Sequence, residues 1–320
     1  MKTVLRALVV GLALTALLAT SALAAKCGEQ DADCWLTVLK KGQPNDAMRA
    51  AMMLGKMKNE AAVPLLIKKL EDKDKYMATA AAYALAQIGK PAIPALIEAT
   101  KHKKSSVRKY AAHSLGQIGG DNYSVLSELT RDPDAAVRLR AIKALTILED
   151  KRAVADAVIA LKDQHIDIRV ASIQLLGILR DSRCVESLAT YSIIDLNPEV
   201  SLEAAAVLIS FGDDAIEPLM RKFPNHSDVV QTRILYVLGE IARNPDTKKE
   251  KTVKDFMIGV VENKNEHSSV KQAAVTKLGD FGDIDVLPSL VKLKSEIEGK
   301  PDYADLLQVT VRTLEKLGHK

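Results

Sequence analysis

The sequence predicts an all-α fold, a right-handed α-solenoid of about nine stacked helix pairs. Three observations predict it. Of the 320 residues 48% are hydrophobic but only 4% are aromatic, so the core is built from small aliphatic side chains, which favours helices over sheets. One apolar pattern with helical spacing recurs along most of the chain. Glycine and proline interrupt this pattern at regular places, as they do at helix ends.

The first 24 residues have the organisation of a secretory signal peptide. Lys2 and Arg6 precede an apolar run from Ala7 to Ala19, and Ala22-Leu23-Ala24 forms an A-x-A cleavage site. The alternative is an uncleaved membrane anchor, but the run is shorter than the roughly 20 residues that a span needs. We therefore expect an exported bacterial protein of the periplasm or cell envelope, without stable membrane insertion after cleavage.

Residues 25–43 are expected to form an N-terminal cap. Cys27 and Cys34 lie in KCGEQDADCW, and an oxidising compartment favours a disulfide between them; the alternative is two free or buried thiols. Trp35 is expected to pack in this cap near the first helix pair. Cys184 remains, and its place in a helical repeat indicates a small buried hydrophobic residue.

The repeated pattern is clearest at Val137, Ala141, Leu145 and Leu148, whose spacings of 4, 4 and 3 place them on one helix face. The same pattern recurs at intervals of 30 to 40 residues, a regularity that chance amphipathicity does not produce. Its leucine anchors lie at Leu54, Leu85, Leu115, Leu145, Leu176, Leu208, Leu238, Leu278 and Leu314. Residues 44–320 are therefore expected to form the solenoid.

A second, shorter helix is expected after each patterned helix. Glycine often ends the patterned helix, as at Gly89 and Gly119, and suits the left-handed position beyond a helix end. The apolar segment that follows carries proline where the first helical turn tolerates it, at Pro64, Pro94, Pro218 and Pro288. Each unit is thus a helix pair, and pairs must stack because one pair alone leaves an apolar face exposed.

Polar residues at the helix entries are expected to have structural roles. Asp132 and Asp134 precede a patterned helix and are expected to cap it. Arg108, Arg138 and Arg169 each follow the inward Val or Ile, and are expected to bridge to neighbouring acids or carbonyl groups.

The segment DPDAAVRLRAIKAL, together with LGQIG at residues 115–119, resembles HEAT repeats, specifically the short HEAT-like repeats also found in phycobilisome lyases. The resemblance covers residues 44 to 318. It implies a superhelix related to the HEAT and armadillo folds, and a family whose members are mostly protein-binding scaffolds with unrelated partners.

The sequence contains no recognisable catalytic or metal-binding motif, and it predicts no catalytic, cofactor or metal site. The six His residues form no HExxH and none is followed by Glu, the pair with which the HEAT-type deoxyhypusine hydroxylases ligate iron. Processing after Ala24 leaves 43 basic and 41 acidic residues, and this near-neutral balance argues against nucleic-acid binding. The alternative is an enzyme or cofactor-binding protein with an unrecognised site.

The function predicted is a non-enzymatic scaffold that binds a protein or peptide partner along a groove formed by the second, shorter helices. Candidate contact residues are Lys68, Glu98 and Glu128, which occupy equivalent positions in three of these helices. The inserted segment RNPDTKKEKT, residues 243–252, is either a contact loop or a solvated polar loop. The sequence leaves the partner and the oligomeric state open.

Cleavage is expected after Ala24, because the charged, apolar and small-residue regions occur in the order that signal peptidase substrates require. Amino-terminal sequencing of the exported protein should read Ala25-Lys26-Cys27. A membrane-bound product that retains residues 7–19 would contradict this expectation.

Overall fold

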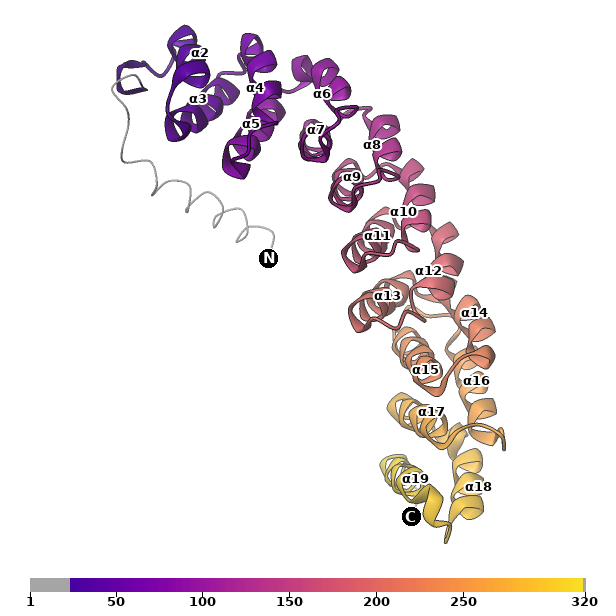
Figure 1. The fold of residues 1–320 in the computed structure, drawn as a ribbon. Coiled ribbons are helices and arrows are strands. Elements are labelled where there is room, and N and C mark those ends of the chain that lie inside the picture. Colours follow the sequence, from indigo (N-terminus) through magenta and orange to yellow (C-terminus); the bar gives the residue numbers. More distant parts are fainter. Residues whose placement is uncertain (1–23, 319–320) are drawn as a thin grey trace. The chain divides into compact units, whose positions relative to one another are not determined.

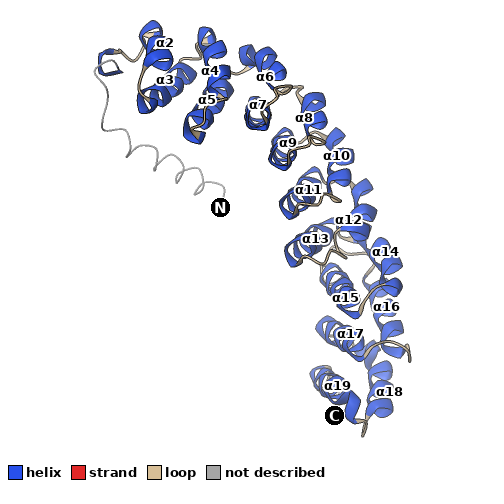
Figure 2. Ribbon diagram, in the orientation of Figure 1, coloured by secondary structure: helices blue, strands red, loops and turns tan. Residues whose placement is uncertain are grey.

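The computed structural model describes residues 24–318, so residues 1–23 of the expected signal peptide lie outside the described part. The described chain is helical and contains no strand (Figure 2). This confirms the predicted all-α class. The chain divides into two compact units, here called the N-terminal unit, which ends at Ala153, and the C-terminal unit, which begins at Val154.

Between Ala24 and Ala153 the N-terminal unit contains four helix pairs. Each pair has one short and one long helix, except the first, whose two helices are similar in length. The helices of this unit are η1 (Ala24–Lys26), α2 (Ala32–Lys41), α3 (Pro44–Lys56), η2 (Glu60–Ala62), α4 (Val63–Lys69), α5 (Lys75–Ile88), η3 (Lys90–Ala92), α6 (Ile93–Ala99), α7 (Ser105–Ile118), α8 (Tyr123–Leu129), α9 (Ala135–Leu148) and η4 (Lys151–Ala153).

The described part of the C-terminal unit, from Val154 to Gly318, contains five helix pairs. Its helices are α10 (Val154–Ala160), α11 (Ile166–Leu179), η5 (Ser182–Cys184), α12 (Val185–Tyr191), α13 (Pro198–Phe211), α14 (Asp213–Lys222), η6 (Phe223–Asn225), α15 (Asp228–Ala242), α16 (Glu250–Glu262), α17 (Ser268–Phe281), η7 (Ile284–Val286), α18 (Leu287–Ile297), η8 (Pro301–Tyr303) and α19 (Ala304–Lys316).

The helices of each unit form two layers. In the N-terminal unit α3, α5, α7 and α9 form the long-helix layer, and α2, α4, α6 and α8 form the short-helix layer (Figure 1). Within this unit the row of helices bends, with the long helices on the inner side. The first pair starts at Ala32, inside the segment 25–43 that was expected to be a cap, because α2 packs against α3.

The leucine anchors form the core of both units. All nine, from Leu54 to Leu314, are at most 3% exposed, and the small residues four positions before them, such as Ala111 and Ala141, are fully buried. The repeat pattern of the sequence is therefore the packing pattern of the structure. Burial of one such leucine contributes about 1.5–3 kcal/mol relative to exposure.

Helix ends follow the predicted glycine pattern. Gly89 and Gly119 follow their helices with φ of 83° and 73°, where a residue with a Cβ is strained. Where the repeat lacks this glycine, Glu149 and Arg180 take the left-handed conformation instead.

Three of the four prolines lie where they were predicted. Pro64, Pro94 and Pro288 occupy the first turn of α4, α6 and α18. The prediction for Pro218 is wrong, because α14 starts at Asp213, directly after Gly212, and Pro218 lies inside the helix. Two acidic residues in the first turn, Asp213 and Asp214, favour this earlier start.

A disulfide between Cys27 and Cys34 closes the N-terminal loop of the structure, with a Cα–Cα distance of 5.5 Å. Next to the loop, in α2, the indole Nε1 of Trp35 donates a hydrogen bond to the carbonyl oxygen of Gly28 at 3.0 Å, and the Trp35 side chain is buried. On the chain-entropy model, closing so short a loop contributes about 2–3 kcal/mol.

Adjacent long helices approach each other closely at glycine. A Cβ built on Gly116 in α7 would lie 2.6 Å from the Cβ and 2.8 Å from the Cα of Ala144 in α9. Likewise, a Cβ built on Gly55 in α3 would lie 2.7 Å from the Cα of Ala84 in α5. Small residues thus set the spacing of the long-helix layer, and close spacing on this side accounts for the direction of the bend.

Arginine side chains join successive pairs, as predicted. Arg108 in α7 donates two hydrogen bonds to Asp132, from Nε at 2.6 Å and from Nη2 at 2.7 Å. Its Nη1 donates to the carbonyl oxygen of His102 at 2.9 Å. Arg169 and Asp195 repeat this arrangement in the C-terminal unit.

The expected capping role is divided between the two acids. Asp134 caps α9 by accepting from the amides of Ala136 and Val137. Asp132, by contrast, pairs with Arg108 and accepts from the amide of Asp134, which holds the loop before the helix.

Gly116→Ala is expected to lower stability and Gly259→Ala to raise it, although the chemical change is the same. The first Cβ collides with the backbone of α9, an overpacking that typically costs about 1–3 kcal/mol. The second Cβ, in α16, would meet no atom of another element within 4 Å, so alanine gains up to about 1 kcal/mol of helix propensity. Thermal denaturation of both variants checks the sign; a stabilised Gly116→Ala variant would refute the close packing.

Arg108→Ala is expected to destabilise the protein by about 3–5 kcal/mol, because it leaves the Asp132 carboxylate buried without its partner. The side chains of Arg108 and Asp132 are 14% and 5% exposed. Arg221→Ala is the matched control, since the Arg221–Glu186 pair has the same 2.6 Å separation but is 59% and 50% exposed, and is worth at most about 1 kcal/mol. Equal losses in chemical denaturation would count against the role of burial.

Candidate protein-interaction surfaces

The candidate contact residues lie in one row of the short-helix layer. Lys68, Glu98 and Glu128 belong to α4, α6 and α8, each two residues after a buried leucine, and all three are exposed. Glu98 forms an ion pair with Lys101 at 3.2 Å. The structure therefore keeps these side chains at the surface and in equivalent positions.

A hollow of about 420 Å³ lies next to Glu98, between α4 and α6. Ile67, Ala95 and Val107 contribute apolar atoms to it, while Glu71 and His102 contribute polar ones. Lys104 donates a hydrogen bond to Glu71 at 2.8 Å, and this bond lowers the pKa of the Glu71 carboxyl group. The short-helix layer thus has a hollow with both apolar and ionic walls at this position.

The side of the bend on which these residues lie differs from the sequence-based expectation. The groove was expected along the second, shorter helices, but in the N-terminal unit the short helices form the outer layer of the bend (Figure 1). The physical reason is the close packing at Gly55 and Gly116, which brings the long helices together. Any contact through Lys68, Glu98 and Glu128 is a contact with the outer layer.

The long helices of the N-terminal unit present a second surface, here called the long-helix face. It consists of the residues that lie nine, six, five and two positions before each leucine anchor and two positions after it, in α3, α5, α7 and α9. None of these residues is buried. They are Asn45, Met48, Arg49, Met52 and Lys56; Tyr76, Thr79, Ala80, Tyr83 and Gln87; Ser106, Lys109, Tyr110, His113 and Gln117; Ala136, Leu139, Arg140, Lys143 and Ile147.

Large apolar and aromatic side chains are exposed on the long-helix face. Tyr76 is 66% exposed, Tyr83 50%, Ile147 49% and Met52 41%. The face continues from α5 to α7, because the Tyr110 hydroxyl of α7 lies 3.4 Å from Thr79 Oγ1 of α5. Exposed apolar residues grouped on one surface are typical of interaction sites.

The charges of the long-helix face are all positive at neutral pH. It carries five Lys and Arg residues and no Asp or Glu. Burial, together with the positive charge of Arg140, lowers the pKa of His113 to about 4, so this imidazole is neutral. The sequence analysis missed this face, although comparing the same position across repeats, counted from the leucine anchor, reveals it.

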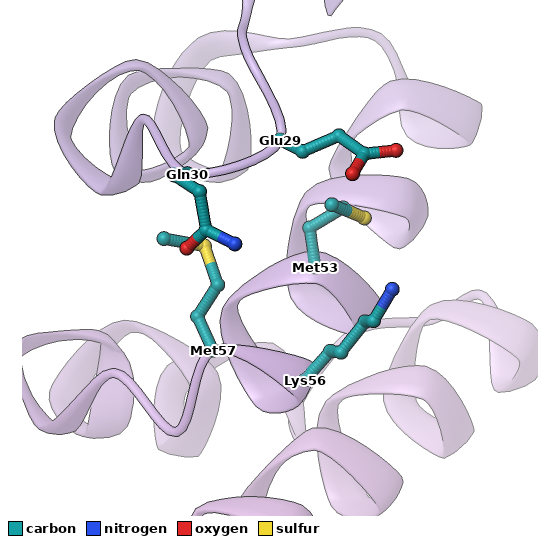
Figure 3. A pocket seen from close by; sticks show the side chains of 5 residues that line it. All are labelled: Glu29, Gln30, Met53, Lys56 and Met57. Carbon is teal, nitrogen blue, oxygen red and sulfur yellow. The ribbon is translucent and has the colours of Figure 1, made fainter.

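A small hollow of about 290 Å³ lies at the α3 end of the long-helix face. Figure 3 shows Met53, Lys56 and Met57 rising from the end of α3, with Glu29 and Gln30 in the preceding loop. Methionine side chains adapt to differently shaped apolar groups. The hollow therefore offers a polarizable wall of methionine beside one cation, Lys56, and one carboxylate, Glu29.

The inserted segment of the C-terminal unit is held against α14. Thr247 Oγ1 and the amide of Lys248 donate to the two carboxylate oxygens of Asp213, at 2.9 and 3.1 Å. Lys249 pairs with Glu217 at 3.2 Å. Because α16 starts at Glu250, the end of the predicted loop is helical rather than irregular.

Residues with possible chemistry are few. Cys184 is fully buried, and burial with the nearby negative charge of Asp181 raises the pKa of its thiol to about 12. Such a thiol stays protonated, and Cys184 is therefore a packing residue, as predicted.

In the described residues no three His, Cys, Asp or Glu side chains gather as a metal site would require. No helix between residues 24 and 318 is long and apolar enough to cross a bilayer.

Comparison with known proteins agrees with the fold. The model of HEAT repeats matches residues 33–116 and 122–192. Solved structures of importin beta (TM-score 0.58, 13% identity, 89% of this chain and 45% of that chain) and of Kap95p (TM-score 0.57, 15% identity, 96% of this chain and 46% of that chain) are similar. This chain thus spans less than half of either protein.

Human deoxyhypusine hydroxylase is matched with a TM-score of 0.34 and 16% identity, over 83% of this chain and 99% of that chain. No curated protein matches the sequence significantly. The family match begins at Asp33, in helix α2 of the first pair, and extends into the C-terminal unit. With the nine helix pairs and their buried leucine anchors, it identifies the chain as a member of the HEAT-repeat family.

Proposed function

We propose that this protein is an exported, non-enzymatic scaffold of the bacterial cell envelope that binds a protein partner through the surfaces of its helix layers. The signal-like residues 1–24 and the Cys27–Cys34 disulfide support export, because disulfides persist in oxidising compartments. Kap95p, whose fold is similar, binds RanGDP, and so this architecture can serve protein recognition.

The exposure of large apolar side chains on ordered helices is the observation that carries the proposal. Leu202 and Val229 in the C-terminal unit are 66% and 64% exposed, like the tyrosines of the N-terminal unit. Packing within the solenoid does not use them, since the leucine anchors already fill the core. A surface that keeps such side chains in water is typical of a protein that covers them in a complex.

Lys68, Glu98 and Glu128 are the proposed contacts of the outer layer. They are supported by their equivalent positions and by the hollow beside Glu98. Because they are exposed, exchanging their charges alters stability by less than about 0.5 kcal/mol each.

Capture of a specific partner is expected when the tagged protein is chemically cross-linked in intact cells, purified from the envelope fraction and analysed by mass spectrometry. The combined Lys68→Glu, Glu98→Lys and Glu128→Lys variant should recover several-fold less partner, with an unchanged melting temperature. Location in the cytoplasm would contradict the envelope part of the proposal. Turnover of a substrate by purified protein, with no partner captured, would favour the enzyme alternative.

A further inference from the structure

We propose that the long-helix face binds an extended, acidic segment of a partner protein that also carries apolar side chains. The inference rests on the proposed scaffold function and specifies the surface and the partner chemistry. It concerns the N-terminal unit alone, and it is distinct from the outer-layer contacts at Lys68, Glu98 and Glu128.

The charge of the long-helix face favours an acidic partner. Arg49, Lys56, Lys109, Arg140 and Lys143 lie on it without a carboxylate among its twenty positions. Among the described residues, Lys56, Arg140 and Lys143 form no ion pair. Cations grouped in this way repel one another, and an acidic partner removes that repulsion.

The apolar side chains of the same face favour a partner that also carries apolar side chains. Lys109 lies over the ring of Tyr110, with Nζ 4.7 Å from the ring centroid, so cation and aromatic surface are interleaved. Tyr76, Tyr83 and Ile147 add exposed apolar area beside them. A ligand that offers only negative charge leaves the apolar side chains exposed to water. A peptide with carboxylates and apolar side chains covers both the cations and the apolar side chains.

The C-terminal unit lacks this basic character. Its long helices carry six acidic and three basic residues at the corresponding positions, so the basic face is not a general property of the repeat. The whole N-terminal unit from residue 25 to 153 has 22 basic and 15 acidic residues, and residues 154–320 have 21 and 26. The excess of basic residues in one unit and of acidic residues in the other nearly cancel, so the net charge of the entire chain does not show this difference.

The shape of the N-terminal unit favours a segment of protein over a membrane surface. The long helices form the inner side of its bend (Figure 1). A flat bilayer does not follow an inward bend, but an extended chain laid across the helices contacts each of them in turn. The methionine hollow beside Lys56 is placed to receive one apolar side chain of such a segment (Figure 3).

Fluorescence anisotropy with a labelled synthetic peptide tests the inference. The probe has about 20 residues, mainly Glu, Asp, Leu and Phe with two prolines that keep it extended. The exported, processed chain should bind it, and affinity should fall as salt rises from about 50 to about 300 mM, because salt screens the charges. Peptides with Gln and Asn in place of the acids, or with Ser in place of Leu and Phe, should each bind at least tenfold more weakly.

Two triple variants with equal charge change locate the site. Lys56→Glu, Lys109→Glu and Lys143→Glu together should weaken peptide binding at least tenfold. Lys73→Glu, Lys90→Glu and Lys151→Glu, all exposed and outside the face, should change it less than twofold. Circular dichroism and melting temperature establish that both variants are folded, and Tyr76→Ser with Tyr83→Ser should weaken binding without a change of charge.

Several outcomes overturn the inference while leaving the scaffold proposal intact. They are absence of peptide binding, equal binding of the neutral peptide, and equal losses in the two triple variants. Tighter binding to vesicles of anionic phospholipid or to heparin, abolished by the same face variant, would assign the face to another polyanion. A dimer in light scattering that the face variant dissociates would assign it to a second copy of this chain. A captured partner whose cross-links all map elsewhere overturns the inference alone, whereas failure to capture any partner counts against the scaffold.

Discussion

The contact between successive long helices is the constraint on which the rest of this structure depends. A single helix pair leaves one apolar face uncovered, and the next pair covers it only if the two long helices come close enough for the leucine anchors to interlock. Gly55 and Gly116 allow this approach because a Cβ at either position would meet the backbone of the next helix. The Arg108–Asp132 pair then fixes the neighbouring loop. The spacing of the long helices, the burial of the leucine anchors and the position of the loop before each long helix therefore depend on one another.

The fold could be predicted largely from the sequence because its determinants are local and repeated. Leu145 and its equivalents recur with helical spacing, and Gly89 and Gly119 end helices for a reason that needs no tertiary information. Pro218 could not be placed correctly, because helix α14 starts earlier than those in other repeats and only the Gly212–Asp214 context shows it. Arg108 was assigned a structural role, but its partner Asp132 is identified only by the packing of successive pairs.

The candidate surfaces were harder to predict than the core, and for a physical reason. Lys68, Glu98 and Glu128 were correctly expected to be exposed, but the side of the bend on which they lie depends on which layer packs more tightly. The basic long-helix face was missed because the acidic C-terminal unit cancels it in the total charge. Neighbouring residues on this face come from repeats about 30 positions apart in the sequence, so composition alone does not reveal the face.

The N-terminal loop has a consequence for assembly. In an array of identical modules, the outer face of the first module can accept another copy, and repeated addition of this kind produces a filament. Here Trp35 of α2 is buried and hydrogen-bonded to Gly28, inside a loop that the Cys27–Cys34 bond ties to the same helix. Part of the terminal module is thus covered by its own chain, which opposes head-to-tail growth through the Trp35 side of α2.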